Sequence, residues 1–137
     1  MADLTIPLAS LVDPAVLDDA RLSVVVRFHD PQKIEMLDLA LFSLANAGYA
    51  EIEVLVCCQD FSADQLAEVR FLIDEMVRPP GSLWRVLNLC GGNGDRRSAL
   101  ANLGIRAATG RYLAFLDFDD VVYAGAHAFL IDRLRAH

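Results

Sequence analysis

The fold class of this chain is decided by the stretch Leu22-Ser23-Val24-Val25-Val26-Arg27-Phe28. Its length and its β-branched residues predict a buried strand. Asp30 then supplies a helix N-cap, and Pro31 suits the first helical position. Apolar residues follow at spacings of three and four until Gly48, which predicts an amphipathic helix built on Ile34, Leu37, Leu41 and Leu44.

The same alternation of strand and helix continues to the end of the chain. Further strands are predicted over residues 51–58, 83–89 and 112–116. Ser62 and Gln65 form a capping box for a helix that carries Leu66, Val69, Ile73 and Val77. Asp95 can cap the next helix, whose packing face holds Ala101, Gly104, Ile105 and Ala108. A last helix is expected over 125–134.

Continuous apolar strands that alternate with amphipathic helices predict a parallel sheet covered on both faces. We therefore expect an α/β fold, a doubly wound and mainly parallel four-stranded sheet of the Rossmann-like class with helices on both faces. Residues 1–21 have weak periodicity and are interpreted as an N-terminal arm, and residues 22–137 as the α/β domain.

Composition narrows the class of protein further. The chain has 137 residues, of which 55% are hydrophobic, and this suits one packed domain. Its net charge of −7 argues against a nucleic-acid partner, which would require a basic surface. No apolar run reaches the roughly 18 residues of a transmembrane segment, and no basic secretory opening follows Met1. The adjacent Cys57 and Cys58 lie in an apolar run and are therefore expected to be buried, reduced thiols. Reduced thiols are typical of a reducing compartment, so a cytoplasmic location is favoured.

Ligands of doubly wound sheets bind beyond the carboxyl ends of the strands, where the strand order reverses. That rule selects residues 28–30, 59–62, 91–97 and 117–120. In the last of these, Asp117 and Asp119 point to the same side if the strand conformation persists. Two converging carboxylates suit Mg²⁺ or Mn²⁺, which completes its shell with water and phosphate oxygens. Alternatively, an acidic residue here caps the next helix, and capping alone would explain Asp120, although three aspartates in four positions exceed what a cap requires.

The glycine-rich segment Gly91-Gly92-Asn93-Gly94 fits neither the Walker pattern nor the dinucleotide fingerprint, so a simple turn remains an alternative. Arg96 and Arg97 follow it in the first turn of a helix, where cations oppose the helix dipole. A docked diphosphate would relieve that cost. Alternatively, both arginines are solvated and pair with Asp95.

Three further polar residues have open interpretations. His29 lines the ligand pocket or is an ordinary loop histidine. Asp60 recognises a base or belongs to the capping around Ser62. Asn102 has poor propensity for its helix, which draws attention to it.

Residues 97–120 resemble the arginine–asparagine–x–glycine, glycine–x–tyrosine and leucine–aspartate–x–aspartate–aspartate stretch of the family-two glycosyltransferases with the GT-A fold. Residues 22–26 resemble the first strand of that family, and residues 53–64 resemble its second strand and turn. The family's proline–x–tyrosine–asparagine after the first strand is here Arg27-Phe28-His29-Asp30.

The resemblance implies the N-terminal, nucleotide-sugar-binding portion of an inverting glycosyltransferase. Asp117 and Asp119 would bind the metal, and Asp117 also the diphosphate of the nucleotide sugar. Asp60 would face the nucleobase, flanked by Phe28 and His29. The donor loop would be supported by Arg96 or Arg97 together with Asn102.

The resemblance also implies a single displacement at the anomeric carbon, in which a carboxylate deprotonates an unknown acceptor. The family's acceptor pocket and catalytic base lie beyond its acidic motif, and only residues 121–137 follow that motif here. No catalytic residue is therefore assigned in this chain, and we expect it to stop before the acceptor half.

Other interpretations stay open. Residues 115–122 also resemble the nucleophile strand of haloacid-dehalogenase-type phosphohydrolases, although that motif belongs on a first strand and the sole lysine of the chain is Lys33. A non-catalytic nucleotide-sugar-binding or interaction module is a second alternative. An exposed apolar edge would favour self-association, and a peripheral position at the inner face of a membrane is also left open.

Overall fold

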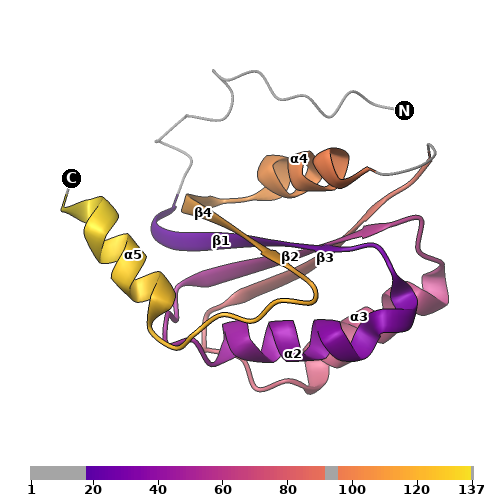
Figure 1. Ribbon diagram of the computed structural model, residues 1–137, viewed down its shortest axis with the longest axis horizontal. Coiled ribbons are helices and arrows are strands. Elements are labelled where there is room, and N and C mark those ends of the chain that lie inside the picture. Colours follow the sequence, from indigo (N-terminus) through magenta and orange to yellow (C-terminus); the bar gives the residue numbers. More distant parts are fainter. Residues whose placement is uncertain (1–17, 92–95, 137) are drawn as a thin grey trace.

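A computed structural model describes residues 18–91 and 96–136, and their centre is a four-stranded sheet (Figure 1). The strands are β1 (Asp18–Phe28), β2 (Ile52–Gln59), β3 (Leu83–Leu89) and β4 (Gly110–Asp117). They lie in the order β3-β2-β1-β4, and every neighbouring pair is parallel. The predicted α/β class with a parallel sheet is confirmed.

Helices cover both faces of this sheet. α2 (Ile34–Ala45), which follows the short 3₁₀ turn η1 (Pro31–Lys33), lies with α3 (Ala63–Glu75) on one face, and α4 (Arg97–Ala107) lies on the other (Figure 1). The chain passes from β1 to β3 through α2 and α3, and α4 then returns it to the far side of β1. The winding therefore reverses between β1 and β4. α5 (Ala126–Arg135) follows and buries Ile131 against the core.

The central strand β1 serves two separate cores because its side chains alternate between the faces. Leu22, Val24, Val26 and Phe28 join the larger core under α2 and α3. Val25 points to the opposite face and packs in the smaller core with Leu100 of α4. Both faces of β1 are excluded from solvent at Val24, Val25 and Val26, which explains why three apolar residues follow one another there.

The observed ends of the helices and strands lie within a few residues of the ends predicted from the sequence. Asp30 caps η1 through a 3.1 Å bond from the Gln32 amide, and the Ser62–Gln65 capping box is present as predicted. β1 begins at Asp18, earlier than the predicted Leu22. The expected contribution of Val77 to α3 is wrong: that helix ends at Glu75, and Val77 is 90% exposed. Pro79 disfavours helical geometry in the residue before it, so the helix ends early. The predicted cap Asp95 lies outside the described residues.

None of the helices in residues 18–91 and 96–136 combines the length and the apolar character that a membrane span requires.

The cysteine thiols are free and differ sharply in environment. Burial raises the pKa of Cys57 and of Cys58 to about 12, whereas Cys90 is exposed. Since the thiolate is the nucleophile, iodoacetamide at pH 7.5 is expected to alkylate Cys90 alone in the folded protein and all three cysteines in urea. Mass spectrometry measures the difference, and a Cys90→Ser control should take no label when folded. Rapid labelling of Cys57 or Cys58 without denaturant would contradict the buried placement.

Candidate functional site

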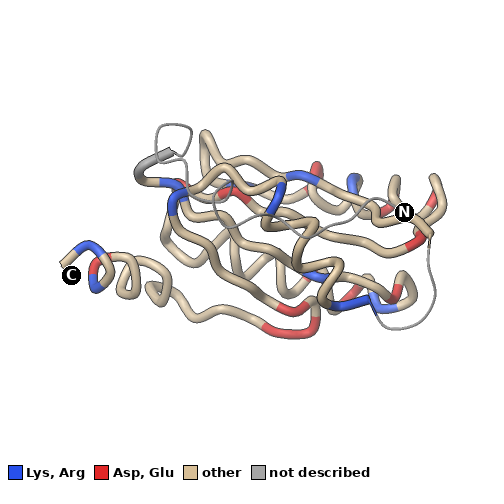
Figure 2. Tube along the Cα trace, turned by 90° about the horizontal axis from the view of Figure 1, so that it is seen from above, with Lys and Arg blue, Asp and Glu red and all other residues tan. Residues whose placement is uncertain are grey.

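The carboxyl ends of β1 and β4 form the point where the winding reverses, which is the position that binds ligands in doubly wound sheets. Figure 2 shows acidic residues gathered in the turn that leads from the sheet toward the C-terminal helix. This turn follows β4 and contains Asp117, Asp119 and Asp120.

These three aspartates lie close enough together to share one cation. Each offers one carboxylate oxygen, and the three oxygens lie within 4.8 Å of one another. Asp117 is half-buried and the other two are exposed. The expected cause of the convergence needs correction, because β4 ends at Asp117 and does not continue to Asp119. A turn closed by a 3.0 Å bond from the Asp120 amide to the Asp117 carbonyl brings the side chains together instead.

Asp120 belongs to this acidic cluster and does not cap the next helix. α5 starts six residues later, at Ala126, and its N-cap is Gly125 in a left-handed conformation. The capping alternative for Asp120 is therefore wrong, since the loop that follows keeps it away from that helix end.

Arg27 on β1 pairs directly with Asp117 on β4. The two residues are partners in the strand register, so their side chains leave the same face of the sheet. The guanidinium donates from Nη2 at 2.6 Å and from Nε at 3.1 Å, both to Oδ1 of Asp117. Arg27 was not among the predicted site residues. The available signal was a charged residue at the end of an otherwise apolar strand, next to the predicted ligand edge.

Aromatic rings pack against one another beneath the loops that follow β1, β2 and β4. The ring of Phe28 is fully buried, with centroids 5.4 Å from those of Phe61 and of Phe118. His29 is exposed and meets the ring of Phe118 edge-on, also at 5.4 Å. Phe28 thus lies beneath the surface of the site, whereas His29 lies on it.

Asp60 connects the ends of β2 and β3. Its carboxylate accepts a 2.8 Å bond from the Gly91 amide, and its own amide donates to the Leu89 carbonyl at 2.9 Å. Asp60 has a left-handed φ of 53°, which aspartate tolerates better than most residues. The side chain is exposed at the rim of the site and simultaneously holds the start of the glycine-rich segment.

Asn88 on β3 holds the neighbouring turn and was missed by sequence reasoning. Its side chain accepts from the Phe61 amide and donates to the Phe61 carbonyl, both at 3.0 Å. Asparagine is depleted in strands, so its place in the predicted strand 83–89 was a usable signal.

The predicted residues of α4 are placed as follows. Arg96 is almost buried, and its guanidinium donates to the carbonyl of Gly91. Arg97 is exposed at the first position of the helix, and Asn102 is half-buried in its middle. Residues 92–94 of the glycine segment lie outside the described residues. Arg96 and Asp60 thus hold the two sides of Gly91, where this segment begins.

Replacing Asp60 by alanine is expected to lower the free energy of unfolding by about 1–2 kcal/mol, because the bond to Gly91 is lost and alanine is strained at positive φ. Urea denaturation measures this change. Asp60→Asn, which keeps an acceptor oxygen and tolerates this φ, should remain within about 0.5 kcal/mol of the parent. Equal losses in both variants would contradict this explanation of the Asp60 contact.

Comparison with known proteins found similar sequences and similar structures, and no family model matches the chain. Two proteins named as uncharacterized glycosyltransferases, from Rickettsia conorii and Rickettsia felis, are each 28% identical over 116 residues. These residues are 85% of this chain but 17% of either relative. The chain thus matches a small part of much longer proteins.

Three crystal structures of S. aureus TarS 1-349 share the fold, with TM-scores of 0.67, 0.68 and 0.65. Sequence identity is 24%, 21% and 22%, and the match covers 85% of this chain and about a third of TarS 1-349. Two of these structures are complexes, one with UDP and one with UDP-GlcNAc. The Rossmann-like α/β fold predicted from the sequence is therefore found in a protein that binds a nucleotide sugar.

Proposed function

We propose that this chain is the donor-binding domain of a glycosyltransferase and binds a nucleoside-diphosphate sugar. The observation that carries the proposal is the acidic cluster of Asp117, Asp119 and Asp120 at the point where the sheet winding reverses. Support comes from TarS, which has this fold and was crystallised with UDP and UDP-GlcNAc, and from the names of the two Rickettsia relatives. More specifically, we assign the enzyme to the family-two glycosyltransferases with the GT-A fold and to the cytoplasm.

The donor set of the cluster fits a hard divalent cation. Mg²⁺ and Mn²⁺ take oxygen ligands and use few protein carboxylates when phosphate is also bound. Asp117 and Asp119 are the residues that would hold the ion. When bound, it supplies positive charge for the diphosphate leaving group.

The chain's own residues contribute binding and orientation. Arg27 fixes Oδ1 of Asp117 from one side and places a permanent cation beside the cluster. Asp60 and His29 lie exposed at the same edge of the sheet and are assigned to the nucleobase side. Arg96, Arg97 and Asn102 are assigned to the donor loop, since Arg96 holds the carbonyl at which that loop begins.

The reaction that this site would serve is an inverting transfer. The acceptor hydroxyl attacks the anomeric carbon, the bond to the diphosphate oxygen breaks, and a carboxylate takes the hydroxyl proton. We assign no residue of this chain as that base. The proposal for the chain itself is therefore donor binding.

Thermal unfolding in the presence of UDP, GDP or dTDP, each with and without Mn²⁺, tests this function. One nucleotide is expected to raise Tm by about 5–10 °C at a hundred times its Kd, and only with the metal present. Asp119→Ala should weaken binding at least tenfold, because it removes a metal ligand. The matched control Asp132→Ala, on α5, should bind as the parent does.

Two outcomes would overturn the proposal. Either no nucleotide raises Tm, or the rise is unchanged in Asp119→Ala. Release of phosphate from a phosphomonoester, lost in Asp117→Asn, would favour the phosphohydrolase alternative instead.

A further inference from the structure

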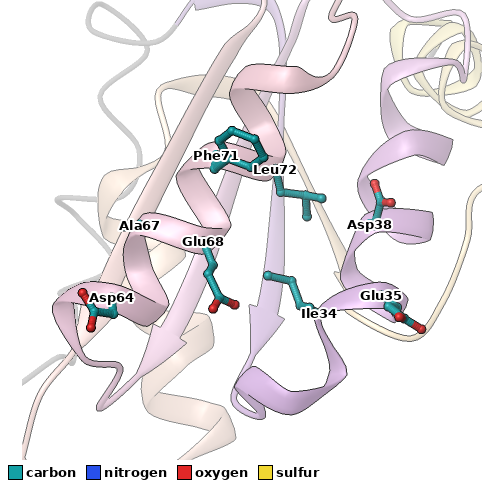
Figure 3. A pocket seen from close by; sticks show the side chains of 8 residues that line it. All are labelled: Ile34, Glu35, Asp38, Asp64, Ala67, Glu68, Phe71 and Leu72. Carbon is teal, nitrogen blue, oxygen red and sulfur yellow. The ribbon is translucent and has the colours of Figure 1, made fainter.

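A groove runs between α2 and α3 on the outer side of the helix layer, away from the sheet (Figure 3). Its volume is about 530 Å³. The floor is apolar and is formed by Ile34 of α2 with Phe71 and Leu72 of α3. Phe71 is 66% exposed, so part of this floor is open to water.

The groove continues along the whole length of the two helices. A second hollow of about 390 Å³ shares Asp38 and Leu72 with the first, and extends to Phe42, Met76 and Val77. Helices of 12 and 13 residues are about 18–20 Å long. Together the hollows form one continuous track, which we name the α2–α3 groove.

Carboxylates line both sides of this groove. In Figure 3 the side chains of Glu35 and Asp38 come from α2, and those of Asp64 and Glu68 from α3. Glu75 continues the row in the second hollow. No lysine or arginine lines either hollow, and none of the five carboxylates is ion-paired within residues 18–91 and 96–136. The groove therefore combines an apolar floor with uncompensated negative charge.

We propose that the α2–α3 groove binds an amphipathic helix from a polypeptide outside this chain. This helix carries lysine or arginine on both sides of its apolar stripe. The stripe covers Phe42, Phe71 and Leu72, and the flanking cations meet the two acidic rims. A helix of about three turns matches the length of the groove. This proposal concerns a different surface from the nucleotide site and does not depend on it.

Charge excludes the simpler occupants. Two copies that met groove to groove would bring ten carboxylates together. α5 of a second copy exposes Phe129, Leu130 and Leu134, but its two arginines already lie over the rings of Phe129 and Tyr112. Anionic lipid headgroups would be repelled by the rims.

The test uses the full chain and a synthetic 14-residue peptide of leucine and lysine with helical amphipathic spacing. Fluorescence anisotropy at 150 mM salt is expected to give a micromolar Kd. Backbone amide chemical-shift changes should map to α2 and α3. A peptide of the same composition but scrambled order, and one with glutamate in place of lysine, should each bind at least tenfold more weakly, because they lack the stripe or the positive charge.

Matched variants separate the groove from general attraction to an acidic protein. Glu68→Lys and Phe71→Ser should each weaken binding at least tenfold. Glu51→Lys makes the same charge change at an exposed site outside the groove, and Phe129→Ser removes a comparably exposed ring on α5. These two controls should change Kd by less than threefold, because they leave the groove intact.

Four outcomes would overturn the proposal. The first is equal binding of the scrambled peptide, and the second is an equal effect of Glu51→Lys and Glu68→Lys. The third is chemical-shift changes at Leu113 and Phe115, which are exposed apolar residues of β4, instead of at the groove. The fourth is self-association, or binding to vesicles of anionic lipid, that is lost in Phe71→Ser.

Discussion

Replacing Glu53 by alanine is expected to lower the free energy of unfolding by about 2–4 kcal/mol, because two hydrogen-bond donors lose their acceptor. Glu53 is fully buried at the second position of β2, a strand in the interior of the sheet. Its Oε1 accepts from the Ser23 hydroxyl at 2.7 Å and from the Thr109 amide at 2.8 Å, while Oε2 lies 3.5 Å from Nη1 of Arg85. Truncation removes the acceptor of the buried Ser23 hydroxyl and of the half-buried Thr109 amide, and each polar group left unsatisfied costs about 1–3 kcal/mol. Arg85 is exposed and keeps its bond to the Ala107 carbonyl.

Urea denaturation of Glu53→Ala measures the loss, and two variants control it. Glu53→Gln keeps an acceptor at Oε1 and loses only the charge, so it should cost less than alanine. Glu51→Ala, at an exposed position two residues away, should remain within about 0.5 kcal/mol of the parent. A Glu53→Ala protein as stable as the parent would show that this buried network contributes nothing to folding.

Replacing Gly104 is expected to have the second largest effect on stability. A Cβ atom at this position of α4 would lie 2.5 and 2.6 Å from the two γ-carbons of Val25 and 3.1 Å from its Cβ. Val25 is fully buried in β1 and β-branched, so it cannot turn away. Gly104→Ala should lose about 1–3 kcal/mol through overpacking, despite the roughly 1 kcal/mol that alanine gains in helix propensity. Gly104→Leu should lose more.

A double-mutant cycle tests the cause. Val25→Ala opens the space that the new methyl group requires, so adding Gly104→Ala in that background should cost at least about 1 kcal/mol less than in the parent. Thermal or urea unfolding of the four proteins provides the comparison. Additive losses would show that the close approach of α4 to β1 is not the origin of the effect.

Much of the fold was predictable because local pattern and global fold agree. The Val-rich β1, the Ser62 capping box and the strand 83–89 each have a local cause that acts within a few residues. Errors occurred at element ends, as at Val77, where a proline two residues farther on ended the helix. A hydrophobic residue alone does not determine where a helix ends.

The candidate site was only partly predictable. Asp117 and Asp119 stood out because carboxylates follow an apolar strand directly, but the turn that gathers them with Asp120 depends on the loop's own hydrogen bond. Arg27 and Asn88 bind partners 90 and 27 residues away in sequence, Asp117 and Phe61. Sequence pattern contains no information about contacts at such separations.

The sequence by itself determined the order of strands and helices, the parallel sheet and the edge at which the candidate site lies. Periodicity sets which faces are apolar, and the handedness of crossovers limits how the elements connect. Tertiary structure alone decided which polar groups meet: Glu53 with Thr109, Arg27 with Asp117, and the acidic residues of α2 with those of α3 across one groove. These contacts arise because packing joins elements whose separate sequences do not specify one another.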